Sequence, residues 1–309
     1  MDTSNKNRKK LKKLRRIGYK VKKISDLWKE IPFQLKKKNI PFNPVFIIGC
    51  GRSGTTPLGR SLSQHPDICY LEERRDLWHS AYPELDIWIG RSQKQPKLYA
   101  NADDAEALKT KKINHLFYRE QVAAAKKVLL EKTPINTFRL KFLEKCFPDA
   151  RYIYLHRNGI EVAESIARKT VKGWYGNKNS KLNTLIDFGT MLGLPANESA
   201  LENNFHKGIY EWRLSMEQSD DFFRHINPDR FIDLSYKDFT DNPSNCLKEI
   251  FTFLQLTFDE NLLNRICKKI DHKNASVTQI KDEYTREIGG PLLQETIANS
   301  YRIKKVNER

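Results

Sequence analysis

Three glycines, an arginine and several hydroxyls are concentrated at residues 49–56, with the sequence Gly-Cys-Gly-Arg-Ser-Gly-Thr-Thr. The apolar and mostly β-branched residues 45–48 before this stretch predict a buried strand, and the residues after it have helical spacing. A glycine turn between a strand and a helix N-terminus lets backbone N–H groups and the helix dipole meet one anion. The stretch therefore predicts an anion-binding loop. Its expected ligands are Gly51, Arg52, Ser53, Gly54, Thr55 and Thr56.

The spacing within this loop narrows the kind of anion. Gly49 and Gly54 fit the frame of a nucleotide-binding P-loop, but the next position holds Thr55 where such loops have lysine. A later strand ending in a metal-binding aspartate is also not evident, since residues 151–155 are followed by a histidine and an arginine. We therefore expect the loop to bind one terminal phosphate without a metal. A P-loop NTPase or kinase remains one alternative, and a non-catalytic protein that binds anions or a membrane surface is another.

Charge and cysteine content restrict the class of protein. The 309 residues carry a net charge of +17, and 15 lysines and arginines against three acidic residues place +12 of it in residues 1–40. The remainder carries about +5 (17 minus 12), which suits an anionic cofactor better than a nucleic-acid partner. Five cysteines without a CxxC pair predict reduced thiols, a cytoplasmic location and no zinc site.

The first forty residues form a separate unit in the sequence. Residues 6–30 predict a basic helix with one apolar stripe, ended by Pro32. Three interpretations of this helix stay open: docking on the core of the protein itself, the seam of a homodimer, or peripheral contact with an anionic membrane. We therefore divide the chain into a basic helical extension at 1–40 and one larger domain at 41–309.

Apolar runs alternate with helical patterns along the larger domain. The expected strands cover residues 45–48, 68–71, 128–130, 151–155 and 231–234. This order predicts a P-loop-like three-layer αβα fold with a central parallel sheet of about five strands, whose ligands sit at the carboxyl ends. Residues 170–205 are rich in Lys, Asn and Gly and are expected to form a lid or acceptor segment. The tail after residue 273 is expected to be loop-rich.

Charged residues follow three of these strands. Glu73, Lys132 and Arg157 lie at or just after strand ends, and Ser165 lies on the helix that follows Arg157. Arg157 and Ser165 can reach one anion, distinct from the anion of the glycine loop. Two phosphate sites at one sheet edge predict a nucleotide that carries phosphates at both ends of its ribose.

Together these motifs resemble those of the sulfotransferases that depend on 3′-phosphoadenosine 5′-phosphosulfate (PAPS), in particular the Golgi glycan and tyrosylprotein types and bacterial relatives. Residues 51–56 resemble the family's 5′-phosphosulfate loop, and residues 151–159 with Ser165 resemble its 3′-phosphate motif. The Glu-Lys-Thr-Pro sequence at 131–134 is similar to a strand-end signature of the Golgi enzymes. The resemblance covers about residues 44–256.

The resemblance implies in-line sulfuryl transfer from PAPS to a hydroxyl or amine, without a metal and with adenosine 3′,5′-bisphosphate as product. It implies that Glu73 is the general base, with Glu72 as the alternative, and that Lys132 stabilises the bridging oxygen. Ser276 is implied to face the sulfuryl group. The acceptor stays open among glycan, lipid, peptide and small molecule.

Two further expectations concern residues near the implied site. Glu131 is expected to support Lys132. Trp174 and Tyr175 are expected either to form a platform for the acceptor or to anchor their loop in the core.

Overall fold

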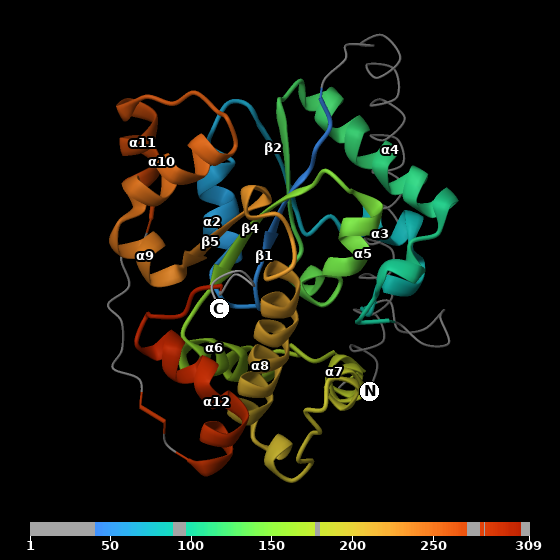
Figure 1. The fold of residues 1–309 in the computed structure, drawn as a ribbon, viewed down its shortest axis with the longest axis vertical. Coiled ribbons are helices and arrows are strands. Elements are labelled where there is room, and N and C mark those ends of the chain that lie inside the picture. The colour runs from blue at the N-terminus through green and yellow to red at the C-terminus, as the bar shows by residue number, and fades with distance from the viewer. Residues whose placement is uncertain (1–40, 89–96, 177–179, 271–278, 281, 304–309) are drawn as a thin grey trace, which may run out of the picture.

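A computed structural model describes residues 41–88, 97–176, 180–270, 279–280 and 282–303 (Figure 1). Two sequence predictions lie outside these residues, namely the basic helix at 6–30 and the site residue Ser276.

A single sheet of five parallel strands forms the centre of the fold (Figure 1). The strands are β1 (Val45–Ile48), β2 (Ile68–Glu72), β3 (Val128–Lys132), β4 (Arg151–His156) and β5 (Phe231–Ser235). Their order is β2-β3-β1-β4-β5, so the loop after β1 lies between the carboxyl ends of β3 and β4. The parallel sheet confirms the predicted fold class.

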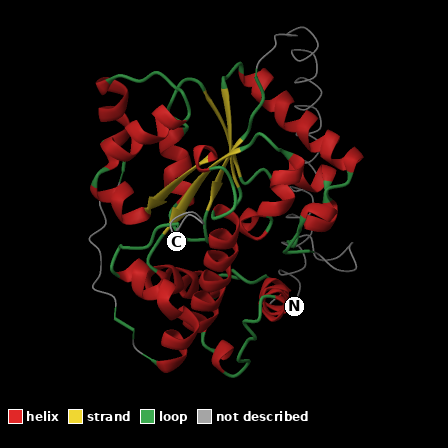
Figure 2. Cartoon of the chain, viewed as in Figure 1, coloured by secondary structure: helices red, strands yellow, loops and turns green. Residues whose placement is uncertain are grey.

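Successive residues of each strand pack on opposite faces of the sheet, as the pleat requires. Phe46 and Ile48 belong to one apolar core, whereas Val45 and Ile47 belong to the other. Helices therefore cover both faces, which gives the three layers seen in Figure 2. The first core includes residues of α3 (Arg75–Ala81), α4 (Ala107–Ala124), α5 (Leu140–Cys146), α6 (Gly159–Thr170), α7 (Ser180–Met191) and α8 (Asn204–Phe223). The second includes residues of α2 (Thr55–Leu62), α9 (Tyr236–Asp241), α10 (Pro243–Phe253) and α11 (Glu260–Cys267).

Helices α6 and α8 pack closely with α12 (Glu283–Ile297) beyond the carboxyl ends of the strands (Figure 1). A Cβ atom at Gly208 would lie 2.8 Å from the backbone of Ala163, so glycine permits the close approach of α8 to α6. The expectation of a loop-rich tail is wrong, because α12 buries Leu293 against this pair. Gly290, with φ 53°, and Pro291 interrupt the helix and its apolar periodicity, which explains the error.

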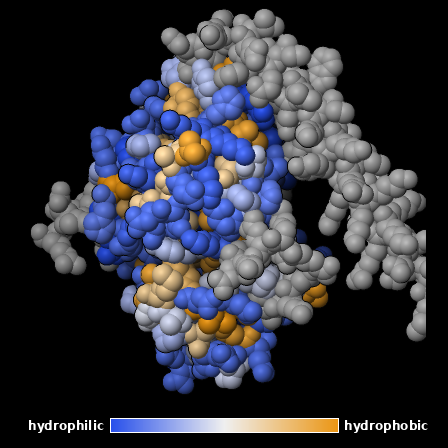
Figure 3. All heavy atoms as spheres, turned by 90° about the vertical axis from the view of Figure 1, so that its right-hand side faces the viewer, coloured by the Kyte–Doolittle hydropathy of each residue, from blue (hydrophilic) through white to orange (hydrophobic). Residues whose placement is uncertain are grey.

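Short 3-10 helices occur in the connections between the longer elements. They cover Pro83–Leu85, Ala102–Asp104, Pro134–Phe138, Ala200–Glu202 and Pro228–Arg230. One face of the molecule is predominantly hydrophilic, with separate apolar areas (Figure 3). Within the described ranges, every helix is too short or too polar to cross a bilayer.

Candidate active site

The glycine loop joins β1 to α2 at the centre of the sheet edge. Gly54 adopts a left-handed conformation with φ 99°, and a Cβ atom there would lie 2.2 Å from the Tyr236 ring. Ser53 closes the turn, because its N–H donates to the carbonyl of Cys50 at 3.0 Å. Within the described chain no side chain caps the N-terminus of α2. Among the described residues, no side chain therefore competes with an anion for the first N–H groups of α2.

Lys132 connects this loop to the end of the neighbouring strand. Its buried ammonium donates to Thr56 Oγ1 at 2.7 Å and to Glu73 Oε1 at 2.6 Å. The backbone explains the second contact, since β2 and β3 pair Glu72 with Lys132 and the N–H of Glu73 donates to the carbonyl of Lys132. Glu73 itself has φ 48°, and its carboxylate is half-exposed. Three residues predicted for the site thus meet at one point.

Glu72 and Glu73 have different partners although they are adjacent. Glu72 accepts two hydrogen bonds from the exposed Arg60, at 2.9 and 2.7 Å. This interaction holds the pKa of Glu72 below its ordinary value. Glu73 is therefore the carboxylate that contacts Lys132, while Glu72 is engaged at the surface of α2.

Arginines gather on the other side of the loop, at the end of β4. Arg52 Nε donates to Ser165 Oγ at 3.1 Å, and an Arg157 N–H donates to the Arg52 carbonyl at 3.4 Å. The Arg157 guanidinium also lies 4.3 Å from the centre of the Tyr236 ring and pairs with Glu161. The sequence assigned Arg52 and the Arg157–Ser165 pair to separate phosphates, but the structure places them in contact.

The electrostatics of this cluster favour a bound anion. Burial lowers the pKa of Arg52, and the positive charges of Arg157 and Arg168 lower it further. Like charges held this close repel one another, and an anion between them would relieve the repulsion.

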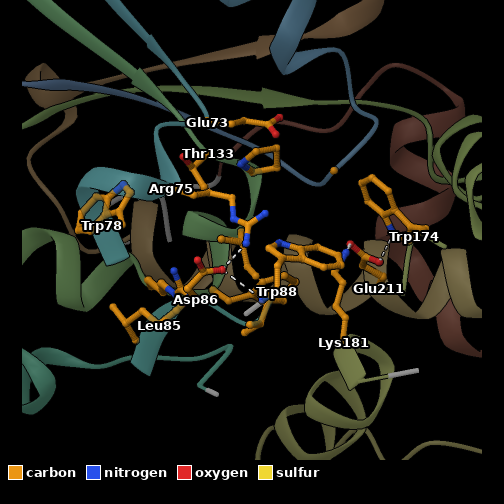
Figure 4. Close-up of a pocket in the computed structure, with 16 residues that line it drawn as sticks. Glu73, Arg75, Trp78, Leu85, Asp86, Trp88, Thr133, Trp174, Lys181 and Glu211 are labelled. Carbon is orange, nitrogen blue, oxygen red and sulfur yellow. Dashed lines mark hydrogen bonds and ion pairs between the residues drawn. The ribbon is translucent and has the colours of Figure 1, made fainter. Parts of the chain in front are cut away.

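A pocket of about 190 Å³ opens beside Glu73 (Figure 4). Gly51 and Thr133 contribute to its wall together with Glu73, so the pocket adjoins the predicted anion loop. Its other walls come from α3 and the segment after it, from residues 134–139 after β3, and from Trp174, α7 and α8. The arrangement gives a second compound access to the Glu73 carboxylate, which contacts Lys132.

A sequence model of the sulfotransferase family matches residues 44–260. The chain belongs to the sulfotransferase family. An uncharacterized protein of Aquifex aeolicus (strain VF5) is 23% identical over 256 residues, 82% of this sulfotransferase and 31% of that protein. The nodulation protein NoeE of Sinorhizobium fredii (strain NBRC 101917 / NGR234) is 32% identical over 138 residues, which are 39% of this sulfotransferase and 30% of NoeE. The chain therefore spans about a third of the length of these curated relatives.

Two solved sulfotransferase domains are similar in structure. The domain from the curacin biosynthetic pathway has 19% identity and a TM-score of 0.46, covering 85% of this chain and 94% of that domain. The domain from the Synechococcus PCC 7002 olefin synthase has 21% identity and a TM-score of 0.48, and the similarity covers 88% of this chain and 92% of that domain. The family match confirms the family that the motifs predicted.

The two aromatic residues of the expected acceptor segment of this sulfotransferase have different surroundings. Tyr175 is buried in the core, whereas Trp174 lines the pocket and donates to Glu211 at 2.9 Å. Glu211 also forms a buried ion pair with Lys181, whose ammonium lies 4.2 Å from the Trp174 ring centre. Removing one member of such a pair leaves an uncompensated buried charge, which typically costs about 3–5 kcal/mol.

The sequence did not single out these two charges. Glu211 lies between the buried aromatic residues Tyr210 and Trp212. This position in the sequence could have indicated a buried carboxylate. Lys181 lies in a segment whose weak periodicity gave no sign that its side chain would be buried.

Glu131 lies on the opposite face of β3 from Lys132, because adjacent strand residues alternate. It accepts hydrogen bonds from Trp78 and Asn136, each at 3.1 Å, and from Thr133. The expectation that it partners Lys132 is therefore wrong. Complete burial raises the pKa of Glu131 from 4.5 to about 7.

This raised pKa predicts a pH dependence of folding. The unfolded chain loses the Glu131 proton near its ordinary value, so stability is highest below that value and falls as the pH rises through about 7. We expect Glu131 to account for about 2.5 kcal/mol of lost unfolding free energy between about pH 5 and pH 8. Chemical denaturation of the wild type and Glu131→Gln at both pH values measures this contribution. Equal pH dependence in the two proteins would contradict the raised pKa.

Proposed function

We propose that this sulfotransferase uses PAPS as donor and moves its sulfuryl group to a hydroxyl or amine bound in the pocket beside Glu73, without a metal. The observation that carries the proposal is the contact of Lys132 with both Glu73 and Thr56. It joins a base and a cation to the anion loop, and Glu73 and Gly51 line a pocket beside them.

The residues at the sheet edge fit a donor with two phosphate groups. The N–H groups and hydroxyls of residues 51–56 would hold the phosphosulfate, and Arg157 with Ser165 would hold the 3′-phosphate. Arg52 belongs to both places, because its backbone lies in the loop while its guanidinium contacts Ser165. The assignment of Ser276 remains a prediction from the resemblance.

Each protein group has a defined part in the transfer. PAPS supplies the sulfuryl group, whose bond to the 5′-phosphate oxygen breaks as the acceptor oxygen bonds to sulfur. Glu73 accepts the proton of the acceptor hydroxyl, which makes that oxygen a better nucleophile. Lys132 donates to the oxygen that remains on the phosphate and stabilises the electron pair left there. Since Lys132 is buried, its charge acts in a medium that screens it weakly.

Calorimetry with nucleotides tests the proposed donor. The site is expected to bind adenosine 3′,5′-bisphosphate at least about tenfold more tightly than ATP, because ATP lacks the ribose phosphate that we propose Arg157 and Ser165 hold. The affinity is expected to be the same with and without magnesium. Tighter binding of ATP, or bisphosphate binding that requires magnesium, would contradict the proposal and favour a P-loop NTPase.

A further inference from the structure

The pocket beside Glu73 has walls that are mainly apolar and aromatic (Figure 4). These walls include Leu85, Ile87, Trp88, Ile135, Phe138 and Trp174. The Trp88 ring comes within 3.6 Å of the position that a Cβ atom would take at Gly176, so it reaches the turn before α7. Trp88 thereby closes one side of the pocket while 38% of its surface stays exposed.

Apart from Glu73, the charged residues of the pocket bond to one another or to the backbone. Arg75 pairs with Asp86, and Lys181 pairs with Glu211. The buried Arg139 donates three hydrogen bonds to backbone carbonyls. A ligand with many hydroxyls would lose its bonds to water here and find few replacements, which disfavours a sugar.

The volume of the pocket indicates the size of the group that it can enclose. A cavity of about 150 Å³ accommodates benzene, and this pocket has about 190 Å³. One aromatic ring with a hydroxyl and a small substituent fits this space. Aromatic walls also favour such a ring, because aromatic pairs gain energy beyond the burial of their area.

We propose that the acceptor is a small, largely apolar aromatic alcohol. Its ring lies among Trp88, Ile135 and Phe138, and its hydroxyl is presented to Glu73. This inference rests on the proposed sulfuryl transfer and specifies the acceptor of the same site.

Turnover with a panel of acceptors tests the proposal. The full chain is given PAPS with 4-methylphenol, a four-ring steroid alcohol, an N-acetylglucosamine disaccharide or a tyrosine-containing pentapeptide, and release of the bisphosphate is measured. We expect kcat/KM for 4-methylphenol to exceed that of each other acceptor by at least about tenfold, the scale on which pocket fit discriminates. Higher kcat/KM for the steroid, the sugar or the peptide would overturn the proposal.

Binding measurements separate this inference from the proposed function. Calorimetry of 4-methylphenol is carried out on the protein saturated with adenosine 3′,5′-bisphosphate. If the bisphosphate binds but 4-methylphenol does not, the aromatic acceptor is overturned while sulfuryl transfer stands. If the bisphosphate itself does not bind, the proposed function fails and the inference fails with it.

Variants of Trp88 locate the ligand in the pocket. Trp88→Ala is expected to raise KM for 4-methylphenol about tenfold, and Trp88→Phe is expected to restore most of that loss. Bisphosphate affinity should stay within about twofold of the wild type in both, which shows that the fold is retained. Leu108→Ala, an exposed position outside the pocket, serves as the control. Unchanged KM in Trp88→Ala would place the acceptor elsewhere and overturn the proposal.

Discussion

Glu73→Ala is expected to lower turnover at least about a hundredfold while adenosine 3′,5′-bisphosphate still binds with wild-type affinity. The reason is that Glu73 contacts Lys132 and lines the pocket, where it can take the proton of the acceptor. Its side chain is half-exposed, so its removal leaves no cavity in the core. Single-turnover kinetics with saturating PAPS, together with calorimetry of the bisphosphate, separate chemistry from binding.

Glu72→Ala is the matched control for this experiment. It removes the neighbouring carboxylate, which pairs with the exposed Arg60 and not with Lys132. Exposed pairs of this kind contribute little to stability, so turnover should remain within about twofold of the wild type. Unchanged turnover in Glu73→Ala would remove Glu73 from the mechanism, and loss confined to Glu72→Ala would make Glu72 the base.

Lys132→Met is expected to lower kcat by about a hundred- to a thousandfold, the usual effect of removing a group that stabilises developing charge. Methionine keeps most of the buried apolar stem but has no ammonium to donate to the departing phosphate oxygen. Folding should persist, because the carboxylate left behind on Glu73 is half-exposed to water. Steady-state kinetics and thermal unfolding measure the two effects.

Lys127→Met is the control variant at the opposite end of β3. Lys127 directly precedes this strand, whereas Lys132 is its last residue. The Lys127 side chain is 71% exposed and pairs with Asp67. We expect kcat to be unchanged in this variant. A similar kcat in Lys132→Met and Lys127→Met would contradict a role of Lys132 in the reaction.

Much of the active-site framework could be predicted from sequence because it depends on local patterns. Apolar runs mark the strands, and parallel strands bring their carboxyl ends to one edge. Glu73 and Lys132 could therefore be expected to lie close, as the pairing of Glu72 with Lys132 shows. The alternation of side chains could also have shown that Glu131 faces away from Lys132.

Other contacts depend on packing between segments that are distant in the chain, so no local sequence pattern could predict them. Lys181 meets Glu211 only because α7 and α8 pack against each other. Arg52 reaches Ser165 because its loop bends in a left-handed conformation at φ 76°. α12 was missed because Gly290 breaks its period, although its burial against α8 stabilises it.

The position of Trp174 gives the two halves of the site a shared boundary. A Cβ atom at Gly51 would lie 2.7 Å from the Trp174 ring, so the indole rests against the anion loop while it also lines the acceptor pocket. A movement of the loop on nucleotide binding would therefore displace a wall of the pocket. Linkage then requires reciprocity, so that the donor changes acceptor affinity by the same factor as the acceptor changes donor affinity. The Trp174 indole thus provides a physical route by which donor binding and acceptor binding affect each other.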